Sequence, residues 1–189
     1  TELLCSAIRC LNSREYVAAA VLARSALELG TVFVDNSITL RTNLNVVINH
    51  LSANPDSVVL SEPLEHFSLR IMWGTRLGSP PKELIQTNVL GSIKRLSQNE
   101  QAKDLLITYE YLCEACHPNV VGNMNYFGGV IELNSDGSKT TLLNRFPDSP
   151  TSKALIEKSL WALSWSCNAT RNAYTGTKSD LETLLGHFK

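Results

Sequence analysis

The chain has 189 residues, of which 43% are hydrophobic and 19% are charged. A chain of this length and composition buries a substantial core, which excludes an intrinsically disordered protein. The net charge is −1 and the 17 Lys and Arg residues are scattered, so charge does not indicate a nucleic-acid-binding protein, although local basic patches stay open. We expect no membrane span, because Arg24 and Glu28 interrupt the best apolar run, residues 16–34.

The five cysteines indicate a reducing compartment. Their number is odd, and Cys5, Cys10 and Cys167 fall within helical apolar patterns. These features are typical of reduced, buried thiols and favour the cytoplasm.

The N-terminal third of the chain predicts three helices. Residues 2–12 and 38–52 carry apolar residues at helical spacing. Residues 14–34 are rich in Ala, Leu and Val on every side, which is typical of a helix at the centre of a bundle.

Three further helices are predicted over residues 61–73, 82–97 and 99–116. Pro63 suits the first turn of the first of these helices. The Gly-Ser-Pro-Pro run at 78–81 separates it from the second, and Pro118 follows the end of the third.

The pattern then changes to that of a β-hairpin, at about residues 125–146. Two β-rich runs flank the turn sequence Asn134-Ser135-Asp136-Gly137. Helical patterns return over 151–173 and 178–188. The sequence therefore predicts a mainly α fold, a single domain of six to eight helices over residues 1–189 with one inserted hairpin, whose free edge would suit a homodimer.

A charged pair lies within the most apolar predicted helix. Arg24 and Glu28 are four residues apart and so share one helix face. Burying two charges costs several kcal/mol per ion unless they are paired, so a pair here is either a buried clamp or part of a functional pocket.

The segment YEYLCEACHP, residues 109–118, holds the second group of candidate residues. One stripe of its helix is expected to face the core, and comprises Leu105, Leu106, Tyr109, Leu112, Cys113 and Cys116. Glu110 and His117 lie at the edge of this stripe with Glu114 just beyond, and they would reach Arg24 and Glu28 if the two helices pack together.

Four interpretations of this segment stay open. Cys113-x-x-Cys116-His117 has the spacing of covalent haem attachment, and the two thiols alone would suit a redox pair, although a helix C-terminus disfavours thiolates. Glu114-x-x-His117 has the spacing of helical metal sites, but no second such motif exists. In the fourth interpretation the cysteines are core residues and His117 caps the helix.

Two motifs together resemble a family of uncharacterised, mostly helical bacterial proteins, a domain of unknown function. LARSALELG resembles that family's L-x-R-S/T-x-x-E segment, and YEYLCEACHP resembles its Y-x-x-L-S-x-x-x-H-P segment, with Cys113 where the family usually has Ser. The resemblance implies a helical core that brings Arg24, Glu28 and His117 together. A looser similarity is to the HEPN domains of toxin and defence systems, but their Arg-x4–6-His motif is absent.

Two functional hypotheses follow from these residues. In the first, the chain is a binding or regulatory module with a polar Arg24–Glu28–His117 cluster, to which Glu110 and Glu114 add binding groups. In the second, it is a hydrolase or nuclease in which His117 acts as acid–base with Glu28 or Glu114 as its partner, and Arg24 stabilises an anion. We expect no resident metal or cofactor in either case.

Overall fold

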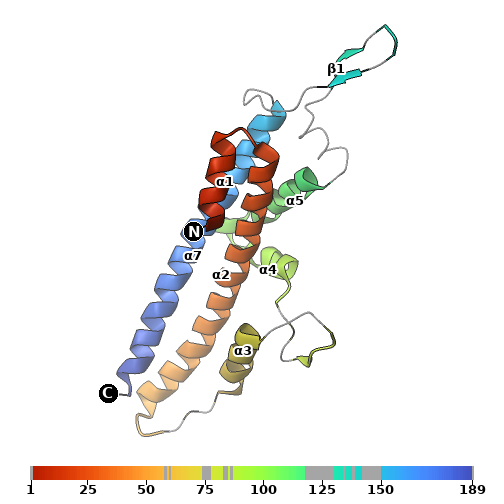
Figure 1. The fold of residues 1–189 in the computed structure, drawn as a ribbon. Helices are drawn as coiled ribbons and strands as arrows, with labels where there is room; N and C mark the ends of the chain where they lie inside the picture. The colour runs from red at the N-terminus through yellow and green to blue at the C-terminus, as the bar shows by residue number, and fades with distance from the viewer. Residues whose placement is uncertain are drawn as a thin grey trace. The chain divides into compact units, whose positions relative to one another are not determined.

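The computed structural model is mostly helical, which confirms the predicted mainly α class. Its ribbon is shown in Figure 1. The structure describes residues 2–57, 59, 61–73, 78–82, 85, 87–117, 130–133, 135–137, 139–141 and 150–188.

The chain groups into two compact units. Unit 1 comprises Thr1–Leu29 and Leu96–Cys167, and unit 2 comprises Gly30–Arg95 and Asn168–Lys189. The two longest helices, α2 (Tyr16–Ala53) and α7 (Pro150–Gly186), each contribute residues to both units. The single-domain assignment stays a prediction.

Unit 1 begins with a helical hairpin. Helix α1 (Glu2–Asn12) lies beside the first part of α2, and three residues join them (Figure 1). Within this turn Arg14 adopts a left-handed conformation with φ 60°, and the Glu15 N–H donates to the Cys10 carbonyl at 2.8 Å. A residue at positive φ is therefore what allows the chain to reverse here.

The core of unit 1 is built largely from small and aliphatic side chains. The 3-10 helix η2 (Glu100–Ala102) and helix α5 (Leu105–Cys116) replace the single helix predicted over 99–116. The buried residues on α2 and α5 include Ala19, Ala20, Ala23, Ala26, Leu27, Leu105, Leu112 and Ala115. So many buried alanines on α2 let neighbouring elements approach its backbone closely.

The unit 1 part of α7 carries a seven-residue repeat. Ser152, Ser159 and Ser166 are each buried and stand seven residues apart. A seven-residue repeat places its members on one seam of a helix. The hydroxyl of Ser166 donates to the Ala162 carbonyl at 2.7 Å, so this polar group is satisfied within its own helix.

Two short strands lie within the region of the predicted hairpin. Strand β1 (Val130–Leu133) pairs antiparallel with β2 (Lys139–Thr141), with Val130 opposite Thr141 and an irregularity before Glu132. Gly137, in the turn, has φ 81°, a conformation that glycine adopts without strain. Much of the range 125–146 lies outside the described residues, so the hairpin over that full range stays a prediction.

Unit 2 contains two short helices beside its parts of α2 and α7. Helix α3 (Glu62–Trp73) begins at the position predicted from Pro63. Helix α4 (Val89–Leu96) is shorter than the predicted helix over 82–97, and the Asn88 side chain, which accepts a hydrogen bond from the Leu90 N–H at 3.1 Å, marks its start. The buried residues of this unit include Leu44, Val47, Leu51, Phe67 and Ile93.

The predicted break between residues 34 and 38 is wrong, because α2 runs continuously from Tyr16 to Ala53. Three polar residues occupy the expected break, and all of them are used within the fold. Asp35 and Ser37 are buried, and Asn36 accepts a hydrogen bond from Thr87 at 3.3 Å. Polar residues that find partners on neighbouring segments need not interrupt a helix.

The predicted break between residues 173 and 178 is also wrong, because α7 continues to Gly186. Gly176, within the expected break, makes room for another side chain. A Cβ atom at this position would lie 2.5 Å from Nη1 and 2.8 Å from Cζ of Arg41. Arg41 in turn donates through Nε to the Asp180 carboxylate at 2.6 Å.

The hydropathy of α2 corrects the expectation that no apolar run reaches the length of a membrane span. An 18-residue window of this helix has a mean hydropathy of 1.7, and 39% of that window is buried in the structure. Its two charges do not lower the mean enough to exclude a span by length and composition. The central helix of a water-soluble fold meets the same criterion, so a cytoplasmic location stays a prediction.

Candidate functional site

The predicted Arg24–Glu28 pair forms, but it is less buried than expected. Arg24 Nε lies 3.3 Å from Glu28 Oε1 on the unit 1 part of α2, and the two side chains are 30% and 27% exposed. The Nε atom itself is buried without a partner at hydrogen-bonding geometry. Because both side chains keep access to water, the pair avoids most of the desolvation cost of a fully buried ion pair.

Helix α5 brings Tyr109 and Cys116 to this pair. Burial raises the pKa of Tyr109 most, followed by a hydrogen bond with Cys113 and by the charge of Glu28. Burial likewise raises the pKa of Cys116, although the positive charge of Arg24 opposes that shift. The predicted packing of these two helices is therefore present, and both the phenol and the thiol are held in their neutral forms at neutral pH.

The other predicted residues of this segment face outward. Glu110, Glu114 and His117 are all exposed. His117 is the C-cap of α5, where its backbone N–H donates to the Cys113 carbonyl at 3.1 Å. Within the described residues, its side chain makes no hydrogen bond or ion pair with Arg24 or Glu28. The α5 residues whose pKa values respond to the charges of the pair are thus Tyr109 and Cys116.

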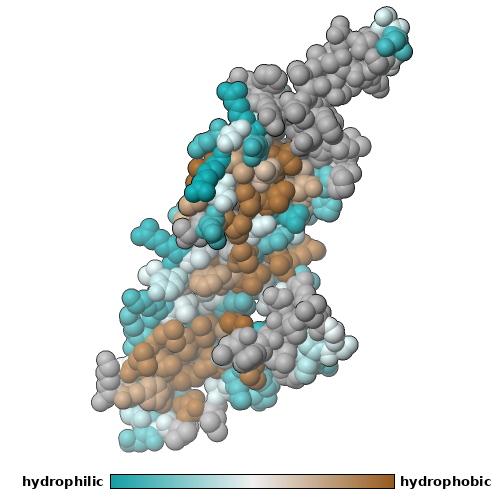
Figure 2. Space-filling model, in the orientation of Figure 1, coloured by the Kyte–Doolittle hydropathy of each residue, from teal (hydrophilic) through white to brown (hydrophobic). Residues whose placement is uncertain are grey.

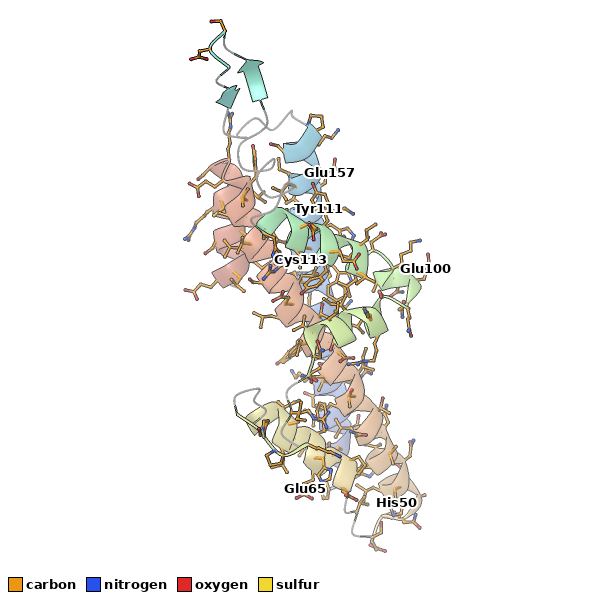
Figure 3. The ribbon with its side chains drawn as sticks, turned by 90° about the vertical axis from the view of Figure 1, so that its right-hand side faces the viewer. His50, Glu65, Glu100, Tyr111, Cys113 and Glu157 are labelled. Carbon is orange, nitrogen blue, oxygen red and sulfur yellow. The ribbon has the colours of Figure 1, made fainter. Side chains whose placement is uncertain are left out.

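The core-facing stripe of α5 is rotated from its predicted position. Leu105 and Leu112 are fully buried as expected, but they are joined by Thr108 and Ala115. Tyr109, Cys113 and Cys116 are only partly buried, and Figure 3 shows Cys113 together with Tyr111 on this helix. The two thiols therefore lie at the margin of the core rather than inside it.

The thiols of the Cys113-x-x-Cys116-His117 motif lie in the last turn of α5. The negative end of the helix dipole disfavours a thiolate there, in the same direction as the burial that raises the pKa of Cys116. Among the described residues, no three His, Cys, Asp or Glu side chains are grouped so that they could hold a metal ion.

Unit 2 contains a second candidate site, centred on a buried carboxylate that sequence reasoning missed. Asp35 of α2 has a side chain that is only 12% exposed. Its carboxylate accepts a hydrogen bond from Ser92 Oγ at 2.7 Å and is bound by Arg95 through both Nε, at 3.2 Å, and Nη2. The hydrogen bond to Asp35 raises the pKa of the Arg95 guanidinium above its ordinary value. Asp35 thereby holds Arg95 against α2 in a bidentate contact.

A pocket of about 600 Å³ opens beside this network. It is formed by α2, α3, the segment before α4, and α4. Its lining residues are Asp35, Asn36, Thr39, Phe67, Arg70, Lys82, Ile85, Thr87, Asn88 and Arg95. We refer to it below as the basic pocket.

The basic pocket carries excess positive charge. Arg70, Lys82 and Arg95 supply three cations, and Asp35 supplies the single carboxylate among its described lining residues. That carboxylate is already bound to Arg95. Within the part of the chain that the structure describes, Arg70 and Lys82 form no ion pair, so their charges are open to a ligand. Four separate segments supply these residues, and no local sequence motif signals them.

No protein family, curated protein or solved structure matches the chain. The resemblance to a bacterial family of unknown function therefore stays a prediction.

Proposed function

We propose that this protein is a binding or regulatory module whose ligand is a small organic anion held in the basic pocket. One observation carries the proposal, namely a concave site whose described lining residues comprise three cations and one carboxylate, which is already bound to Arg95. Its volume of about 600 Å³ lies in the range typical of small-molecule sites. An unbalanced positive charge in such a site attracts an anionic group.

The lining residues narrow the chemical class of the ligand. Arginine presents a planar fork that matches phosphate and carboxylate groups, and Arg95 is held in place by Asp35. Phe67 and Ile85 give the pocket an apolar wall, and Asn36 and Asn88 add amide groups. A ligand with a phosphate or carboxylate at one end and an apolar or planar portion at the other would satisfy both regions.

Thermal unfolding in the presence of defined anions tests the proposal. The probes are AMP, citrate and inorganic phosphate, each titrated to millimolar concentration. A ligand present at 100 times its Kd stabilises the folded state by about 2.7 kcal/mol, which corresponds to a rise in Tm of roughly 5–10 °C for a chain of this size. A larger shift with AMP or citrate than with phosphate would show that the organic portion is recognised.

Variants of Arg70 and Lys82 supply the specificity control. Arg70→Ala and Lys82→Ala should each weaken binding about tenfold, because each removes one charge-assisted contact. Lys153→Ala removes the same charge from an exposed position on the unit 1 part of α7 and should change nothing. If none of the anions raises Tm, or if all three variants bind equally, the basic pocket is not the binding site.

In this proposal the Arg24–Glu28 pair and Tyr109 act as a clamp between α2 and α5. The alternative, a hydrolase or nuclease that uses Arg24, Glu28 and His117, has less support, because the His117 side chain is exposed and the neighbouring phenol and thiol are neutral. His117→Ala separates the two ideas. An enzyme that uses His117 would lose activity and keep its Tm. A binding module would keep both its anion binding and its Tm, because His117 caps α5 through its backbone N–H, which alanine retains.

We also infer that residues 125–146 form the predicted β-hairpin as a whole. The pairing of β1 with β2 and the positive φ of Gly137 support this inference. Cross-strand nuclear Overhauser effects between residues 130 and 141 would support it, and their absence would contradict it.

A further inference from the structure

Unit 2 also contains an apolar groove, which shares Asn36 with the basic pocket. It has a volume of about 520 Å³ and lies between α2 and α7, with one side chain from α3. Its lining residues are Phe33, Asn36, Ser37, Leu40, Ile71, Tyr174, Thr177, Lys178, Leu181, Glu182 and Leu185. Figure 2 shows hydrophobic surface gathered over the C-terminal part of α7 and the adjoining part of α2.

Large apolar side chains in this groove are open to water. Phe33 is 40% exposed, Ile71 51%, Tyr174 61%, Leu181 41% and Leu185 59%. Single exposed apolar residues are ordinary, but a contiguous group of this kind marks an interaction surface on a folded protein.

The spacing of these residues suits a helix as the occupant. On α7 the exposed residues Tyr174 and Leu181 stand seven residues apart, and Leu185 follows four residues after Leu181. On α2, Phe33 and Leu40 are also seven apart. A seven-residue apolar repeat on two neighbouring helices forms a seam into which a further helix packs.

The charges within the groove indicate which helix occupies it. Lys178 and Glu182 are four residues apart on α7 and flank Leu181. Their own contact is long, with Nζ 3.7 Å from Oε1, and their side chains are 59% and 65% exposed. An exposed pair of this kind contributes little to stability, so both charges are available to a partner.

This charge pattern is complementary to itself. In a two-fold dimer the same patch serves both subunits, so residue i meets residue j in both directions. If an antiparallel copy of α7 packs with the two-fold axis near residue 180, Lys178 of each copy lies opposite Glu182 of the other. The apolar residues on either side of these charges then cover one another.

We propose that this groove is a homodimer interface and that its occupant is a second copy of this chain. The surface differs from the hairpin edge that the sequence suggested for a dimer, and it differs from the basic pocket. The charges that would bind the anion, Arg70, Lys82 and Arg95, do not line the groove, so the pocket variants and the groove variants test the two proposals separately.

Sedimentation equilibrium of the full chain across a concentration series tests this proposal. The expected result is a reversible dimer of twice the 20.8 kDa chain mass. Leu181→Glu should convert the protein to a monomer, because it places a charge at the centre of the apolar contact. Leu185→Ser, at a more exposed position, should weaken the dimer with less risk to the fold, and circular dichroism melts would check that both variants fold.

Charge reversal identifies the partner as a second copy. Lys178→Glu and Glu182→Lys should each weaken the dimer about tenfold, since each places like charges opposite one another twice. The double variant carrying both substitutions should recover the dimer. The matched control reverses Lys153 and Glu157, an exposed pair with the same spacing on the unit 1 part of α7, and should have no effect.

Three results would overturn the proposal. The first is a monomer at every concentration, which would assign the groove to another protein or to an apolar ligand. The second is a dimer that survives Leu181→Glu in a folded variant. The third is a double charge reversal that fails to recover the dimer, because it would show that residue 178 of one copy does not lie opposite residue 182 of the other.

Discussion

Gly176 offers a sharp test of how α7 accommodates the side chain of Arg41. In an ordinary exposed helix interior, replacing glycine by alanine stabilises the fold by about 0.5–1 kcal/mol. At this position the new Cβ would lie 2.5 Å from Nη1 and 2.8 Å from Cζ of Arg41. The guanidinium must therefore move, and we expect this movement to break its hydrogen bond to Asp180, to which Nε donates at 2.6 Å.

The expected magnitude follows from the exposure of the two partners. Arg41 is 43% exposed and Asp180 is 16% exposed, so solvent screens the pair, and we set its loss at about 1–2 kcal/mol. This loss cancels or slightly exceeds the gain in helix propensity. Gly176→Ala alone should therefore change the free energy of unfolding by roughly 0 to −1.5 kcal/mol, whereas in an Arg41→Ala background it should stabilise by about 0.5–1 kcal/mol.

Urea denaturation, monitored by circular dichroism, gives the free energy of unfolding of the wild type, Gly176→Ala, Arg41→Ala and the double variant. Gly91→Ala is the matched control, because its Cβ would meet only ordinary contacts, at 3.5 Å from Arg95 Nη1 and 3.8 Å from Asn88 Cβ. That substitution should not depend on Arg41. If Gly176→Ala stabilises the protein equally in both backgrounds, the steric argument is refuted.

Three other predictions concern stability. Asp35→Ala should lower the free energy of unfolding by about 2–3 kcal/mol, because it leaves Arg95 without its buried carboxylate, and a loss below about 1 kcal/mol in urea titrations would contradict this. Because Tyr109 and Cys116 have raised pKa values, the unfolded chain releases these protons first. Their contribution to stability is therefore complete below the ordinary pKa values of 9.0 and 10.0 for cysteine and tyrosine and is lost as pH rises further. A melting temperature that stays constant from pH 8 to 11 would argue against those shifts. Arg14→Gly should raise stability by about 0.5–1 kcal/mol, since it relieves a left-handed residue, and an unchanged Tm would show that the arginine is not strained.

Sequence periodicity was sufficient to locate most helices but not to find where they end. The start of α3 near Pro63 and the end of α5 before Pro118 follow from local backbone chemistry, and both were predictable. The continuity of α2 through Asp35 was not predictable in this way. Whether a polar residue in a helix marks a break depends on a partner such as Arg95, which lies 60 residues away in the chain.

The candidate sites show the same limit. Arg24 and Glu28 could be found because they share one helix face and interrupt an apolar run. The contact of Tyr109 with that pair depended on the rotation of α5, which Thr108 and Ala115 shift by burying themselves in the core. A helical wheel that counts only apolar side chains predicts the wrong buried face when a polar residue such as Thr108 occupies a core position.

The division of the chain into two units has a consequence for its biosynthesis. Each unit is discontinuous, and each needs part of α7, which is made after α2. Helix α2 is complete at residue 53, almost 100 residues before α7 begins. At a translation rate of about 5–20 residues per second, roughly 5–20 s pass between the synthesis of α2 and that of α7, which covers its apolar faces. During that interval the nascent chain presents a long, hydrophobic helix of the kind that ribosome-associated chaperones shield, so the yield of folded protein should depend on translation speed between residues 53 and 150.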